Sequence, residues 1–138
     1  MIKALLFWAP THSLLTSIGL LILRLGFGGF MLAAHGWPKL VGFSEKAGSF
    51  PDPIGVGSPA SLALAVFSEV VCALLVMIGL TTRLALIPLI ITMGVAFFII
   101  HGEDPFQRKE LAMMYLVAYV AMMFPGPGVF SVDARLAR

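Results

Sequence analysis

The sequence predicts an all-α integral membrane protein: a four-helix bundle with antiparallel neighbours and both termini on the same side of the membrane. Of its 138 residues, 59% are hydrophobic and 12% are charged, whereas a soluble domain has about 25% charged residues. Its apolar runs approach the roughly 20 residues that a helix needs to cross a hydrocarbon core of about 30 Å. These runs occupy most of the chain, so we expect one transmembrane domain over residues 1–138 and no soluble catalytic domain.

Helix start and stop signals set the bounds of the expected spans. Pro38, in the Gly-Trp-Pro sequence, is expected to end the first span, because proline disfavours helical geometry in the residue before it. Ser58 and Pro59 are an expected N-cap and first helical position. The expected spans are residues 14–35, 59–80, 84–101 and 105–124, and the loop 39–57 lies on the far face, away from the termini. A connection of this length suggests a lid over that face.

Charge and cysteine content exclude several classes of function. The formal net charge is only +2, which is too small to indicate nucleic-acid binding. Cys72 is the only cysteine, so the chain forms no intrachain disulfide and carries no CxxC dithiol. Lysine and arginine flank the two sides equally, and the acidic residues of the far face favour cytoplasmic termini.

Arg24 is the anomaly within the first apolar run, because an arginine at the centre of a span costs roughly 2.5–3.5 kcal/mol. It precedes His35 by 11 residues, which places it about 16 Å beneath the far face. Glu69 follows Pro59 by 10 residues, about 15 Å beneath the same face. We therefore predict an Arg24–Glu69 ion pair that shapes an inner pocket. The alternative is a purely structural pair that fixes helix register.

Three further titratable residues, His35, His101 and Glu110, are expected near the far-face helix ends, with Lys39 and Asp104 close by. An apolar pocket with a few convergent polar groups suits an amphipathic molecule such as a quinone. Histidine exchanges protons near neutral pH, although both histidines could simply be interfacial. No metal site is predicted, because HxxxH and HExxH spacings are absent. The candidates for catalysis are His35, His101 and Glu110, and those for ligand binding are Arg24, Lys39, Glu69 and Asp104.

Several different short motifs follow one another along most of the chain, and together they are typical of one family. They are Leu23-Arg24, His35-Gly36 and Pro38-Lys39 around the first span, Glu69 and the turn 79–83 in and after the second, His101 at the end of the third, Glu110 at the opening of the fourth, and Gly126-Pro127-Gly128 with Ser131 and Asp133 after it.

In this pattern the chain resembles the DoxX family. The resemblance implies a four-helix bundle in a bacterial or archaeal plasma membrane. It also implies a role in an oxidoreductase system, because the family includes a small subunit of an archaeal thiosulfate:quinone oxidoreductase and relatives linked to thiol and oxidative-stress defence. The chain has no haem ligand pair, Fe–S cysteines or flavin fingerprint of its own.

Any redox role therefore needs a non-covalently bound quinone and a partner. The expected partners are membrane lipids, quinone, a soluble oxidoreductase subunit and a second copy of the chain in a homodimer. Two alternatives are a non-enzymatic scaffold that anchors a soluble partner through the loop 39–57 and a transporter of a small acid or thiol. Whether the chain is itself an enzyme is left open at this point.

Overall fold

The computed structural model describes residues 12–138, and within that range it contains helices and no strands. Three helical stretches are long and apolar enough to span a membrane, namely Leu14–Val41, Ser58–Ile78 and Thr82–Ile100. A fourth long helix, α8, runs from Phe106 to Met123. Large apolar side chains are exposed on the outer surface of all four stretches, as expected where hydrocarbon replaces water as the solvent.

The stretches are built from shorter segments. The first comprises α2 (Leu14–Phe30), η1 (Met31–Gly36) and α3 (Trp37–Val41), and a short α4 (Phe43–Lys46) follows it. The second comprises α5 (Ser58–Val66), η2 (Phe67–Cys72) and α6 (Ala73–Ile78). The third comprises α7 (Thr82–Val95) and η3 (Ala96–Ile100), and the chain closes with α8 and α9 (Val132–Leu136).

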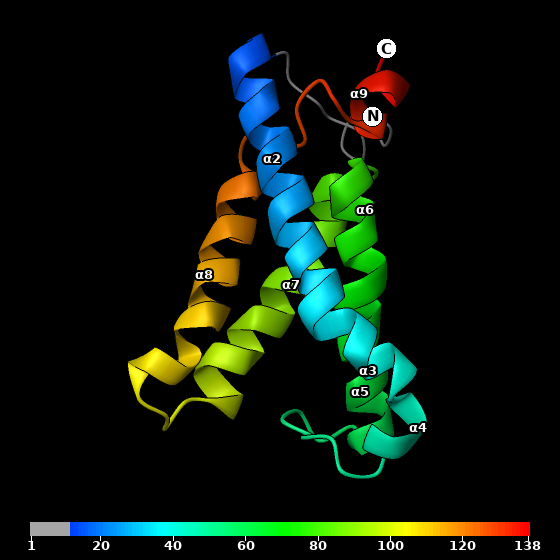
Figure 1. Ribbon diagram of the computed structural model, residues 1–138, viewed down its shortest axis with the longest axis vertical. Coiled ribbons are helices and arrows are strands. Elements are labelled where there is room, and N and C mark those ends of the chain that lie inside the picture. The colour runs from blue at the N-terminus through cyan, green and yellow to red at the C-terminus, as the bar shows by residue number, and fades with distance from the viewer. Residues whose placement is uncertain (1–11) are drawn as a thin grey trace.

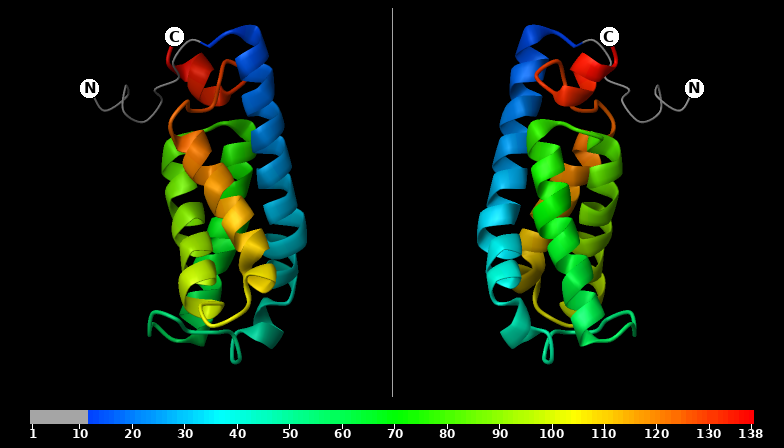
Figure 2. Two further views of the ribbon diagram at one scale, coloured as in Figure 1. Left: turned by 90° about the vertical axis from the view of Figure 1, so that its left-hand side faces the viewer. Right: turned by 90° about the vertical axis from the view of Figure 1, so that its right-hand side faces the viewer.

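The four stretches lie side by side (Figures 1 and 2). The start of α2, the α6–α7 turn and α9 lie at one end, at the top of Figure 1, which we call the upper end. The α4–α5 loop and the link between η3 and α8 lie at the opposite, lower end. The core is centred on α6, α7 and α8, where Val76, Leu86, Leu89 and Tyr119 are fully buried.

The first stretch does not end at Gly36-Trp37-Pro38, as the sequence had suggested, but continues to Val41. The preceding residues Met31–Gly36 form a π-helix, in which the Trp37 amide donates to the Leu32 carbonyl. Proline is tolerated within membrane helices where such local adjustments satisfy the backbone groups that it frees. Gly36 also packs so closely on η2 that an added Cβ would meet the Glu69 carbonyl.

The second stretch begins differently from the expected Ser58 cap. Gly57, with φ of 98°, precedes the helix, and no side chain caps it there. Asp52 instead organises this turn from the loop, since its carboxylate accepts from the Val56 amide (2.9 Å), the Gly57 amide (2.8 Å) and the Ser61 hydroxyl (2.8 Å). The Ser61 bond is the largest cause of a lowered Asp52 pKa, and the Gly57 bond is the next.

Candidate functional site

A cavity of about 670 Å³ lies in the lower half of the molecule, between the first two helical stretches on one side and α7, η3 and α8 on the other. Most of its wall is apolar, and the loop residues Phe50, Pro51, Pro53 and Ile54 contribute to it. The volume falls within the range of about 300–1,000 Å³ that is usual for small-molecule sites. The polar side chains that line the cavity are His35, Lys39, Ser61, Ser68, Glu69, Thr92, His101, Arg108 and Tyr115.

An ion pair between Lys39 and Glu69 lies in the wall of this cavity. The Lys39 ammonium donates to Glu69 Oε2 at 2.6 Å and to the His35 carbonyl at 3.4 Å. The Glu69 side chain is almost fully buried, while that of Lys39 retains 22% exposure. The pair therefore neutralises an otherwise isolated carboxylate inside the membrane.

His35 lies beside this pair and packs its ring edge-on against Tyr115, with ring centroids 5.6 Å apart and planes at 88°. Edge-to-face geometry of this kind is favourable for aromatic rings. Two neighbouring helical stretches place cavity-lining polar residues in π-helical segments, since His35 belongs to η1, and Ser68 and Glu69 belong to η2. Such π-helical segments are frequent at functional sites.

Two hydroxyl groups in the cavity wall are left unpaired. Ser68 is 1% exposed, and its Oγ has no hydrogen-bond partner among residues 12–138. Tyr115 also lines the cavity, and its hydroxyl, which is not fully buried, makes no hydrogen bond to any of the described residues. Buried polar groups in proteins are almost always hydrogen-bonded, so each unpaired one requires an explanation. A polar ligand or water in the cavity would supply the missing partner.

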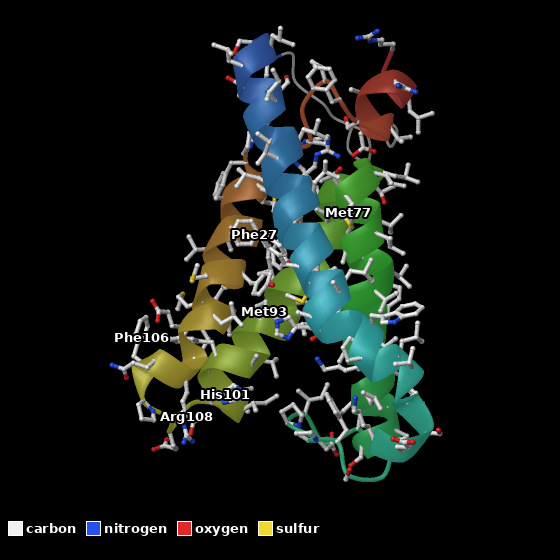
Figure 3. The ribbon with its side chains drawn as sticks, viewed as in Figure 1. Phe27, Met77, Met93, His101, Phe106 and Arg108 are labelled. Carbon is white, nitrogen blue, oxygen red and sulfur yellow. The ribbon has the colours of Figure 1, made fainter. Side chains whose placement is uncertain are left out.

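His101 lies at the lower end of the cavity, where its Nδ1 is 2.7 Å from Asp104 Oδ2. Arg108 lines the same end, and Figure 3 shows both His101 and Arg108 near the link from η3 to α8. The structure thus brings together His35, Lys39, Glu69 and His101 in one cavity. Asp104 contacts His101 but is not itself part of the cavity wall. No group of three or more His, Cys, Asp or Glu side chains within residues 12–138 is placed to hold a metal ion.

Glu110 does not join this cavity. It is exposed on the outer face of the molecule, in a separate shallow hollow between α2 and α8 that is otherwise apolar and includes Leu23, Phe27 and Phe106. The expected convergence of Glu110 with the two histidines is therefore wrong. The side chains on α8 that face the cavity are Arg108, Leu111, Ala112 and Tyr115.

The predicted Arg24–Glu69 ion pair is also wrong. Arg24 lies toward the upper end, where it donates to the carbonyls of Val76 (3.3 Å), Met77 (2.9 Å) and Phe130 (2.5 Å). The depth estimate failed because it placed His35 at the far face. The helix continues beyond His35, and Gly36 lies directly against Glu69. Lys39, not Arg24, is the residue that reaches Glu69.

Arg24 belongs instead to a polar clamp that fastens the C-terminal segment to the α6–α7 turn. Its guanidinium binds carbonyls at the end of α6, where a cation is favoured by the helix dipole. Asp133 binds the start of α7, accepting from the amides of Thr81 (2.6 Å) and Thr82 (2.9 Å) and from the Thr82 hydroxyl (2.8 Å). Gly79, with φ of 72°, lies against both Arg24 and Ser131, and an added Cβ at this position would collide with the two side chains.

Ser68 and Tyr115 are among the cavity-lining polar residues that the sequence analysis did not name, as are Ser61, Thr92 and Arg108. Serine and tyrosine are not unusual in an apolar span, and the sequence analysis considered mainly the charged residues and the histidines. One signal was present, since Ser68 adjoins Glu69, whose buried charge indicates a polar interior at that level.

The profile of the DoxX family matches residues 19–102, which is more than half of the chain. The chain belongs to the DoxX family. As a DoxX protein it is an integral membrane protein in contact with lipids, as its three apolar helical stretches indicate. The DoxX match includes most of the helices that line the cavity, since it begins within α2 and ends just after η3.

Relatives of this DoxX protein occur in bacteria. It is similar to the uncharacterized membrane protein Rv3486 of Mycobacterium tuberculosis, with 31% identity over 64% of this chain and 69% of the relative. Two uncharacterized proteins of Haemophilus influenzae are also similar, one 27% identical over 89% of this chain and 86% of the relative, the other 31% identical over 77% and 82%. No solved structure matches the chain.

Proposed function

We propose that this DoxX protein is a membrane subunit of an oxidoreductase system and binds a quinone-like amphipathic molecule in its lower cavity. The observation that carries the proposal is the Ser68 hydroxyl, which is buried in the cavity wall without a partner. A buried hydroxyl without a partner, in the wall of a mostly apolar cavity of about 670 Å³, favours a ligand with a hydrogen-bond acceptor and an apolar body. A quinone has both.

The donors around the cavity fit the oxygen atoms of a quinone. Ser68 and Tyr115 each offer a hydroxyl without a partner among the described residues. Lys39 is held by Glu69, lines the cavity and keeps 22% of its side chain exposed. Together these groups would orient the quinone head, while the apolar wall would exclude water from it.

When bound, a quinone accepts two electrons and two protons. The residues of this chain would bind and orient the head and hold protons near it, and His35 is the natural donor because it lines the cavity and an imidazole can both give and accept a proton. The chain has a single, buried cysteine and no sequence motif for an electron carrier. We therefore propose that a soluble oxidoreductase subunit delivers the electrons, with a homodimer as the simplest further assembly.

The same proposal includes the membrane topology. We propose that α8 crosses the membrane together with the three more apolar stretches, as antiparallel neighbours with both termini in the cytoplasm. The 18 residues of α8 carry their charges, Arg108, Lys109 and Glu110, within the first turns. The remainder of the helix is uncharged from Leu111 to Met123, so its charged residues would lie at the membrane surface.

A quinone-binding titration with matched tyrosine variants tests the proposal. Protein in nanodiscs is titrated with decylubiquinone, and the uptake of empty nanodiscs is subtracted. We expect Ser68→Ala and Tyr115→Phe each to weaken binding about fivefold, because a hydrogen bond contributes about 1 kcal/mol. Tyr119→Phe is the control, since Tyr119 lies one turn further along α8 but bonds the Phe27 carbonyl at 3.0 Å, outside the cavity. The proposal fails if no quinone binds or if all three variants bind alike.

A further inference from the structure

We infer that the cavity is filled sideways from the bilayer, through a gap between α5 and α7, by a molecule whose apolar tail remains in that gap. The inference rests on the proposed function and extends it. It identifies the ligand as a membrane-dissolved, tailed molecule and names the residues that select for the tail.

The rim of the gap consists of apolar side chains that belong to both the cavity wall and the outer surface. On one side these are Leu64 in α5 and Phe67 in η2, with Leu64 53% exposed. On the other side they are Pro88 and Ile91 in α7, with Ile91 60% exposed. A side chain that lines a cavity and is also exposed on the outside marks the edge of an opening. This opening faces hydrocarbon, because it lies within two membrane-spanning stretches.

The helices separate at this level for reasons visible in their packing. α7 packs on α8, η2 and α6, whereas α5, outside its own helical stretch, packs on α3. Figure 1 accordingly shows α5 and α7 diverging toward the lower end. Pro88 interrupts the backbone hydrogen bonds of α7 beside the gap, and the Thr92 hydroxyl bonds the Pro88 carbonyl at 2.8 Å. Both features favour a bend in a helix.

The other sides of the cavity do not suit a hydrocarbon tail. The lower end is covered by the loop residues Phe50, Pro51, Pro53 and Ile54, and Asp52 ties this loop to the first turn of α5 through Ser61. The side between α3 and α8 presents the charged groups of Lys39 and Arg108. The α5–α7 side differs from these, because its rim residues Leu64, Phe67, Pro88 and Ile91 are apolar and lie within two membrane-spanning stretches. A bound amphiphile would thus direct its polar head toward Lys39 and Tyr115 and its tail outward past Ile91.

The test compares a tailed and a tailless ligand in variants that fill the gap. The ligands are decylubiquinone and the same benzoquinone head without its decyl chain. Ile91→Trp and Leu64→Trp place a larger side chain in the gap. Ile87→Trp is the matched control, because Ile87 lies one turn earlier on α7 and is 45% exposed but does not line the cavity. Circular dichroism establishes that each variant is folded, and two gap variants guard against the failure of one.

We expect Ile91→Trp and Leu64→Trp to weaken decylubiquinone binding at least about tenfold and to change binding of the tailless head by less than about twofold. Ile87→Trp should leave both unchanged. If the wild-type protein binds both ligands and the gap variants behave as Ile87→Trp does, the lateral opening is refuted while the proposed function stands. If the wild-type protein binds neither ligand, the proposed function and this inference both fail.

Discussion

Replacing Arg24 should loosen the whole upper end of the molecule. The side chain is 1% exposed, and its guanidinium joins α2 to the last turn of α6 and to the C-terminal segment at Phe130. Arg24→Met keeps much of the volume and removes all three hydrogen bonds. The carbonyls of Val76, Met77 and Phe130 would then lose a charged donor that is itself almost fully buried.

The expected loss follows from these three bonds. A hydrogen bond to a charged group contributes about 1.5–3 kcal/mol, and side-chain hydrogen bonds measured within membranes average about 0.6 kcal/mol. Burying the guanidinium opposes part of the gain, since its Nε has no partner among residues 12–138. We therefore expect Arg24→Met to lower the free energy of unfolding by about 2–4 kcal/mol. Arg24→Lys should lose about half as much, because an ammonium keeps the charge but cannot reach all three carbonyls.

The assay is equilibrium unfolding in mixed micelles with increasing dodecyl sulfate, followed by circular dichroism. Arg135→Ala is the control, because Arg135 also carries a positive charge but lies exposed in α9. We expect that control to remain within about 0.5 kcal/mol of the wild type. If Arg24→Met unfolds at the same dodecyl sulfate concentration as Arg135→Ala, the clamp contributes no stability and the structural role given to Arg24 is refuted.

Two further predictions concern the lower end. Glu69→Gln and Lys39→Met should each destabilise the protein by about 2–4 kcal/mol, because each leaves a largely buried charge unpaired. The double variant should recover at least half of this loss. Unfolding in dodecyl sulfate measures all three variants, and a double variant no more stable than either single variant would contradict the prediction. The lowered pKa of Asp52 means that its turn is stabilised above the unfolded pKa of about 3.9 and loses that stabilisation as pH falls through the still lower folded pKa. Hydrogen-exchange protection of the Val56 and Gly57 amides should therefore fall in this acidic range and already be low in Asp52→Asn at neutral pH, and equal protection in the two proteins would exclude this role.

Hydropathy predicted the ranges of most helices well, because the length of a membrane-spanning helix must match the thickness of the hydrocarbon core. The helices Ser58–Ile78, Thr82–Ile100 and Phe106–Met123 lie close to the expected ranges. The family resemblance was confirmed, and its scattered motifs have a physical basis at the upper end. There Arg24, Gly79 and Asp133 come from three separate motifs and meet in one clamp.

The candidate site was harder to predict because it depends on how helices are shifted along one another. Reading Pro38 as a stop signal placed His35 at the far face, and the π-helix that carries the chain past this proline has no clear sequence signature. That error moved Arg24 to the level of Glu69 and left Lys39 without its actual partner. The unpaired Ser68 hydroxyl is apparent only once the cavity beside it is known.

The most direct test of the central claim is mass spectrometry of the lipids and quinones that co-purify with the protein from its native membrane. We predict a quinone at a substantial fraction of one molecule per chain in the wild type. Its amount should fall in the Ser68→Ala, Tyr115→Phe double variant and be retained in Tyr119→Phe. Wild-type protein that carries only bulk phospholipid, with no quinone above the level found in the double variant, would contradict the assignment of this cavity as a quinone site.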